Sequence, residues 1–137
     1  MTTETDTREL AENFAAALHA LENGDDGALE RICALFEADA LITNAALDLS
    51  GQAMSGPQGV HDFWGDYRGL FSEVRTEFHQ ITASDEAAGL FWTSKGKAAT
   101  SGEPFEYQGA SLLVFDGDQK ISAFRGYFDT RALTLQA

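Results

Sequence analysis

The chain has 137 residues, of which 44% are hydrophobic and 11% aromatic, and it contains ten phenylalanines. This length and composition are typical of one globular domain with a sizeable core, and they exclude a disordered chain. The formal net charge is −13. Because an acidic surface disfavours nonspecific binding to nucleic acid and to anionic membranes, we expect neither as a partner.

The single cysteine, Cys33, excludes an intrachain disulfide. It lies among apolar neighbours, and we interpret it as a small core residue rather than a reactive thiol. The chain starts without a basic-then-apolar leader, and no apolar run approaches the ~18 residues of a membrane span. The sequence therefore predicts a soluble, cytoplasmic protein.

The first half of the chain carries apolar residues at helical spacing. We expect residues 1–6 to be disordered and a single domain to cover residues 7–137. Helices are predicted from Thr7 to Asn23-Gly24, from about Asp26 to Phe36 with Asp25 or Asp26 as its cap, and from Ser55-Gly56-Pro57 through an apolar stripe that ends at Phe71.

The remaining segments read as strands. Residues 40–49 predict a strand that turns and returns, and residues 74–84 and 87–100 alternate with a period of two. Residues 105–130 predict two long strands joined by the polar turn 116–119, where Asp-Gly between apolar arms is a strong hairpin signal. This order predicts an α+β fold: a cone-shaped, curved antiparallel sheet with three helices packed on its concave face and a pocket between them.

The element order, together with the segments ALFEADALITN, SGPQGV and KISAFRGYFDT, resembles the nuclear transport factor 2-like superfamily and, within it, the SnoaL-like family. The resemblance covers about residues 8–132. It implies the cone fold, and it implies a homodimer formed through the outer face of the sheet. It does not decide the activity, because this fold hosts isomerases, cyclases, dehydratases, epoxide hydrolases and non-catalytic carriers.

Two known mechanisms of this fold were compared residue by residue. The base, tyrosine and protonated acid of ketosteroid isomerases correspond here to Asn44, Phe14 and Ser111, and none of the three matches. The two acids and the arginine of limonene epoxide hydrolases correspond to Ser94, Gly96 and Gly126, so that charged triad is also missing. Only Asn44 resembles a position that helps to hold the attacking water in that family. The resemblance therefore argues against importing either mechanism.

If these correspondences hold, side-chain alternation predicts the residues that face the pocket. From the helices, the expected ligand-binding residues are Phe14, Leu18, Trp64 and Tyr67. From the strands, they are Trp92, Ser94, Tyr107, Ser111, Phe124, Gly126 and Phe128. The glycines at 96, 109 and 126 would either leave room for a ligand or mark bulges where the sheet bends, and the sequence leaves both readings open.

The candidate catalytic residues are Asn44 and His79. Asn44 would orient a ligand oxygen or a water, with a backbone-satisfied asparagine as the equal alternative. His79 is the one plausible proton acceptor near neutral pH, although alternation would also allow it on the outer face. The three histidines show no metal-ligand spacing, so we predict neither a metal nor another cofactor.

The opposite face of the last strand carries Arg125, Tyr127 and Asp129, and Lys95, Lys97 and Arg75 would share that outer face. This mixture suits a homodimer interface, with an ordinary exposed sheet face as the alternative. Two functions remain open at this point. The protein is either an enzyme of the cyclase, isomerase or dehydratase kind acting on a small, mostly apolar molecule, or a non-catalytic ligand- or partner-binding domain.

Overall fold

The structure, a computed structural model, describes residues 3–129. The first two residues of the predicted disordered start, and residues 130–137 of the predicted domain, lie outside the described residues. The expected end of the last strand at Thr130 falls in that second range.

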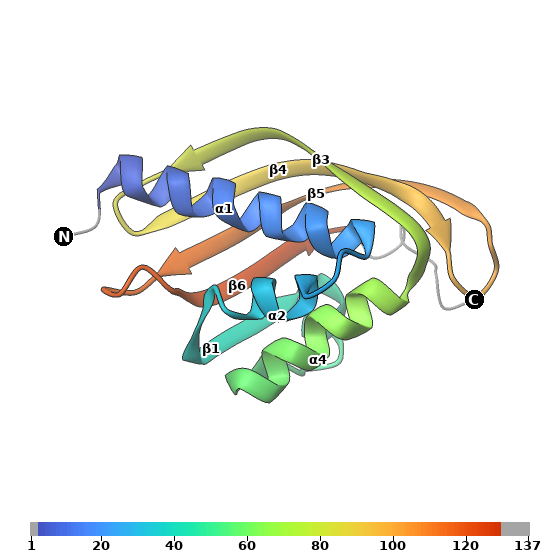
Figure 1. Cartoon of the computed structure of the whole chain (residues 1–137), viewed down its shortest axis with the longest axis horizontal. Coiled ribbons are helices and arrows are strands. Elements are labelled where there is room, and N and C mark those ends of the chain that lie inside the picture. The colour runs from blue at the N-terminus through green and yellow to red at the C-terminus, as the bar shows by residue number, and fades with distance from the viewer. Residues whose placement is uncertain (1–2, 130–137) are drawn as a thin grey trace.

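The fold is α+β, as predicted, with one six-stranded curved sheet and its three longer helices on one side (Figure 1). The strand order is β2-β1-β6-β5-β4-β3. The elements are α1 (Glu4–Asn23), α2 (Ala28–Cys33), β1 (Phe36–Asn44), α3 (Ala45–Leu49), β2 (Met54–Ser55), α4 (Gly56–Gly69), β3 (Phe71–Ala83), β4 (Ala87–Ala98), β5 (Pro104–Phe115) and β6 (Ile121–Phe128). The sheet is mixed rather than wholly antiparallel, because β1 enters it beside β6 in a parallel register.

Helix α1 begins at Glu4, three residues before the predicted start. Its cap is Thr3, whose side chain accepts from the backbone N–H of Asp6 while the Asp6 carboxylate accepts from the N–H of Thr3. The helix ends as predicted at Gly24, which adopts a left-handed conformation with φ of 75°. Figure 1 shows α1 lying over the strands at the β3 edge of the sheet.

The segment after α2 differs most from expectation. The second helix, predicted to end at about Phe36, ends at Cys33, and Phe36 starts β1. Phe36 pairs with Ile121, and the N–H of Ile121 donates to the carbonyl of Leu35 at 2.8 Å. Gly27 rather than an aspartate precedes α2, and no side chain caps it. Residues 45–49 form the short helix α3 rather than a returning strand. The return is made by β2, where Ser55 pairs with Leu41.

The two hairpins follow the predicted pattern. β3 pairs with β4, with irregularities of register at Phe71/Glu73 and Phe78/Gln80. β5 and β6 are joined at Asp116, whose Oδ1 accepts from the backbone N–H groups of Asp118 and Lys120, each at 2.9 Å. This Asx-type turn satisfies backbone groups locally and fixes the β5–β6 register.

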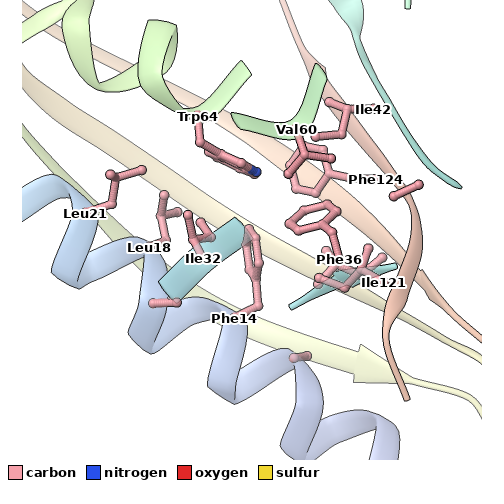
Figure 2. Close-up of a cluster of buried hydrophobic side chains, with 14 of the residues drawn as sticks. Phe14, Leu18, Leu21, Ile32, Phe36, Ile42, Val60, Trp64, Ile121 and Phe124 are labelled. Carbon is pink, nitrogen blue, oxygen red and sulfur yellow. The ribbon is translucent and has the colours of Figure 1, made fainter. Parts of the chain in front are cut away.

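The main core lies between the sheet and the three longer helices. Figure 2 shows side chains from α1, α2, α4, β1 and β6 converging there. Phe14, Ile42 and Ile121 are each 1% exposed or less, and Trp64 contacts Phe124 edge to face with 5.2 Å between ring centroids. Cys33 packs half-buried against this core. Burial, with Glu30 nearby, raises the pKa of its thiol and makes it less reactive.

Candidate ligand pocket

A pocket of about 100 Å³ lies between the inner face of the sheet and helices α1 and α4. Leu70, one of the residues that line it, is 42% exposed. Its lining contains no charged side chain among residues 3–129, and ten of its seventeen residues are aromatic. The lining is Phe14, Leu18, Asn44, Phe63, Trp64, Tyr67, Leu70, Phe71, Thr76, Phe78, Trp92, Ser94, Tyr107, Ser111, Phe124, Gly126 and Phe128.

The structure brings together all eleven residues that the sequence predicted to bind a ligand, and Asn44 lies with them. On β6, side chains alternate between the two faces of the sheet. Phe124, Gly126 and Phe128 therefore face the pocket, while Arg125 and Tyr127 lie on the other side of the sheet. Residues that were not expected also line the pocket: Phe63, Leu70, Phe71, Thr76 and Phe78.

His79 is not among the residues that line the pocket. Its side chain is 47% exposed, its Nε2 lies 2.7 Å from Thr93 Oγ1, and its Nδ1 lies 3.5 Å from a Glu77 carboxylate oxygen. On β3 the inward side chains are Thr76 and Phe78, so the next residue points outward, beside the irregularity of register. We therefore do not retain His79 as the proton acceptor of this pocket.

Asn44 has a structural task that the sequence left open. Its side-chain Oδ1 accepts from the backbone N–H of Leu47 at 2.8 Å and caps α3. This bond fixes the orientation of the amide, because the oxygen must face Leu47. The amide NH₂ makes no hydrogen bond within the described residues, and it belongs to a side chain that lines the pocket.

Gly96, Gly109 and Gly126 could each leave room for a ligand or mark a place where the sheet bends, and the three differ in this respect. A Cβ at Gly96 would lie 2.0 Å from the backbone oxygen of Glu73, and one at Gly109 would lie 2.7 Å from the ring of Trp92. These two glycines permit close packing within the sheet. Gly126 differs, because it lines the pocket and a Cβ there would meet Asn44 Cβ at 3.2 Å. Only Gly126 leaves room on the pocket side.

A buried carboxylate lies directly behind the pocket wall. Glu22 is 5% exposed. Its oxygens accept from Thr76 N–H at 2.8 Å, from Thr76 Oγ1–H at 2.5 Å and from the Tyr67 hydroxyl at 2.7 Å. Ser94 Oγ lies 3.2 Å from Thr76 Oγ1. Since the single Thr76 hydroxyl proton goes to Glu22, Ser94 is the donor in that pair. Glu22 thereby fixes the polar side chains on the wall.

The two pocket tyrosines stay neutral under physiological conditions. Burial, followed by the nearby Glu22 carboxylate, raises the pKa of Tyr67 and of Tyr107 above the ordinary value of 10.0. The Tyr107 side chain is 6% exposed, and its hydroxyl has no hydrogen-bond partner within residues 3–129. Both groups therefore act as hydrogen-bond donors or neutral acceptors rather than as bases.

Both tryptophans of the chain line the pocket. Trp92 Nε1–H donates to Ser111 Oγ at 3.0 Å. Trp64 Nε1 is buried without a hydrogen-bond partner. In Figure 2 this nitrogen lies on the side of the ring nearest Val60 and Phe124. The indole of Trp64 thus belongs both to the apolar core and to the lining of the pocket.

The outer face of the sheet is more apolar than predicted. Phe91 and Tyr127 are 45% and 50% exposed, and both are cross-strand neighbours of Ala110. Arg75 and Lys95 are direct neighbours at its β3–β4 side. Arg125 Nη1 lies 3.4 Å from an Asp48 carboxylate oxygen of the same chain. Charged groups therefore border an apolar centre.

Glu22 is not among the site residues that the sequence predicts. Its spacing on α1 nevertheless indicates an inward position, because it follows Leu18 by four residues and Phe14 by eight, on the face that otherwise carries apolar side chains. A carboxylate on that face must find donors when the helix packs. Those donors lie 45 and 54 residues away along the chain, so no local pattern identifies them.

Comparison with protein families matches residues 12–124 to the SnoaL-like domain. Comparison with curated proteins gives no match. Among solved structures, a hypothetical protein from Catenulispora acidiphila with a ketosteroid isomerase-like fold, in complex with trimethylamine, is similar with a TM-score of 0.77 and 18% identity, covering 95% of this chain and 92% of that one.

Two further solved structures are enzymes. The epoxide hydrolase/cyclase-like enzyme SalBIII, of pyran ring formation in the polyether salinomycin, has a TM-score of 0.74 at 14% identity and covers 93% of this chain and 95% of its own. An epoxide hydrolase from M. tuberculosis has a TM-score of 0.71 at 20% identity, with 93% and 87% covered. At these identities the likeness concerns the fold. No helix within residues 3–129 is long and apolar enough to cross a membrane.

Proposed function

Since this chain belongs to the SnoaL-like family, we propose that its cone pocket binds a small, mostly apolar molecule. The observation that carries this proposal is the lining itself: ten aromatic side chains with a few hydroxyl and amide groups, and no charged side chain among the described residues. Pockets for small molecules have this character, with an apolar wall for affinity and few polar groups for orientation.

The size of the pocket limits the ligand. A cavity of about 100 Å³ is of the order of the ~150 Å³ apolar cavity that accepts benzene. We expect a compact ligand of about one ring, and a longer one would extend out of the pocket. The Glu22 carboxylate behind the wall disfavours an anion.

We propose ligand binding, rather than catalysis, as the first function of the pocket. No histidine, carboxylate or lysine among residues 3–129 lines the pocket. One observation favours the second candidate, an enzyme of the cyclase, isomerase or dehydratase kind: Glu22 holds the Tyr67 hydroxyl at 2.7 Å, and Tyr67 lines the pocket. A hydroxyl paired with a carboxylate is a route for moving a proton.

The first test is native mass spectrometry of the purified protein, followed by denaturing extraction of any bound molecule. We expect a co-purifying neutral compound, or saturable binding when compact cyclic ketones and alcohols are added. Tryptophan fluorescence is the second readout, because both tryptophans line the pocket. If no compact neutral compound bound at millimolar concentration, and fluorescence did not change, the proposal would fail.

We also propose that two copies associate through the outer sheet face and that the protein works in the cytoplasm. Phe91 and Tyr127, each about half exposed, support the dimer because their association would cover apolar surface. Sedimentation velocity should show a dimer, and Phe91→Glu should give a monomer. A monomeric natural chain would contradict the interface. The lone Cys33 suits a reducing compartment, and localisation of a tagged chain tests that part.

A further inference from the structure

Three residues on adjacent strands form one row across the inner face of the sheet. Gly126 on β6 pairs with Asn44 on β1 and with Ser111 on β5, and all three line the pocket. Neighbouring strands lie about 4.8 Å apart, so Asn44 and Ser111 stand roughly 10 Å apart at the backbone. Gly126 contributes no side chain between them, and the Phe124 ring borders the gap, with its Cε1 3.8 Å from the position that a Gly126 Cβ would take. We refer to the gap between Asn44 and Ser111, over Gly126, as the Gly126 notch.

Each side of the notch presents a hydrogen-bond donor that has no acceptor among the described residues. The Asn44 amide oxygen accepts from Leu47 N–H at 2.8 Å, which leaves the NH₂ group to donate elsewhere. The Ser111 oxygen accepts from Trp92 Nε1–H at 3.0 Å, which leaves the Ser111 hydroxyl proton free to donate. Neither Asn44 NH₂ nor Ser111 O–H donates to any group within residues 3–129.

Donors of this kind are costly to leave unpaired in an apolar pocket. Ser111 is 7% exposed, and most of the side chains that line the pocket around it are aromatic. A buried donor without a partner loses its bond to water and gains none in return. An oxygen with two lone pairs, placed over Gly126, would accept from both sides at once.

We infer that the Gly126 notch binds the carbonyl oxygen of an uncharged ligand, with Asn44 and Ser111 as the two donors. This inference rests on the proposed function and narrows it, because it states which group the ligand carries and where that group lies. A carbonyl oxygen accepts two hydrogen bonds in one plane, whereas an anion would be repelled by the Glu22 carboxylate behind the pocket wall. The rest of the ligand contacts the aromatic rings.

The test uses two molecules of nearly equal shape, cyclohexanone and methylenecyclohexane, which differ in the oxygen. We expect the ketone to bind the natural chain at least about tenfold more tightly, since two hydrogen bonds to a neutral acceptor contribute that much. Cyclohexanecarboxylate should not bind detectably. Tryptophan fluorescence and calorimetry both give the dissociation constants.

Two variants test whether the ketone oxygen lies in the notch, and a third variant is their control. Gly126→Ala adds a methyl group 3.2 Å from Asn44 Cβ, and it should lower the ketone-to-alkene ratio of affinities to near one. The matched control is Gly69→Ala, where the added methyl meets nothing within 4 Å and the ratio should not change. Asn44→Asp retains an oxygen that can cap α3 but removes the NH₂ donor, and it should also lower the ratio.

The infrared band of a ¹³C-labelled carbonyl gives an independent readout. Hydrogen bonds to the oxygen lower the stretching frequency, so the bound ketone should absorb at lower wavenumber than in hexane. Ser111→Ala should reverse part of that shift, even if the variant loses some stability.

The outcomes separate the two proposals. Equal affinity for the two probes would overturn the notch and leave the pocket as a ligand site. Binding of neither probe would overturn both. A tenfold ratio that survives in Gly126→Ala and Asn44→Asp, but is lost in Tyr107→Phe, would place the oxygen at Tyr107 and overturn the notch.

Discussion

The space between the helices and the sheet has a packed end and a pocket end, which share helix α4 and strands β1 and β6 but differ in what they contain. At the packed end, Phe36, Ile42 and Ile121 are each 8% exposed or less and close around Val60 (Figure 2). At the pocket end, the aromatic rings of the lining surround a cavity. The Glu22 carboxylate lies behind the wall of this cavity, on the face of α1 that otherwise carries apolar side chains. Close packing at one end supplies the stability that an unfilled, partly polar pocket does not.

The largest difference between the two ends should appear when a side chain is truncated at the packed end. Ile42 is fully buried, and Ile42→Ala should lower the free energy of unfolding by about 2–5 kcal/mol while leaving ligand affinity unchanged. Urea denaturation measures the first quantity. The control is Leu41→Ala, since Leu41 is 42% exposed and should cost at most about 0.5 kcal/mol. Equal losses in both would contradict the packed-end account.

The Glu22 network should give the next largest effect. Glu22→Gln replaces an acceptor-only group with an amide that cannot accept from all three donors, so we expect a loss of about 1–3 kcal/mol in unfolding free energy. Glu12→Gln makes the same charge change at an exposed position of α1 and should be nearly silent. If the two variants were equally stable, the hydrogen bonds of Glu22 would not stabilise the pocket wall.

Alkaline pH tests the same network without mutation. Tyr67 and Tyr107 have pKa values raised in the folded chain, so each tyrosine contributes stability that is fully present below pH ~10 and is lost as the pH rises toward the folded value. Between these limits each should cost about 1.4 kcal/mol per pH unit. Thermal melts from pH 9 to 11 measure the slope, and Tyr107→Phe should remove about half of it. A flat profile would contradict the burial of these hydroxyls.

The smallest effect is expected at Ser111. Ser111→Ala leaves Trp92 Nε1–H without its acceptor at 3.0 Å, which should cost about 1 kcal/mol in unfolding free energy. The emission of Trp92 should shift at the same time, because the indole loses its hydrogen bond. Unchanged emission would mean that this bond does not persist in solution.

How far the sequence predicts this molecule differs between the two ends. Alternation along β6 and helical spacing on α1 and α4 predict the wall residues, because side-chain direction follows from the local period. The strand start at Phe36 could not be predicted in this way, since it depends on pairing with Ile121, 85 residues later. The short run 45–49 is ambiguous between strand and helix, and Asn44 decides it by capping α3.

The candidate site shows the same limit. The period of the sequence predicts the pocket residues, but the hydrogen bonds of Glu22, Asn44 and Ser111 are made with partners on other elements. Spacing can suggest that a polar residue faces inward. It cannot say which of its atoms is already occupied and which remains for a ligand.

The most direct test of the ligand pocket is a ¹H–¹⁵N correlation spectrum recorded during titration with cyclohexanone. The signals to follow are the two indole N–H groups and the Asn44 side-chain NH₂. We predict saturable shifts of the Trp92 indole and the Asn44 amide, with the backbone signals of Phe91 and Tyr127 on the outer face unchanged. Shifts confined to the outer face, or none in the pocket at saturating ketone, would contradict the account.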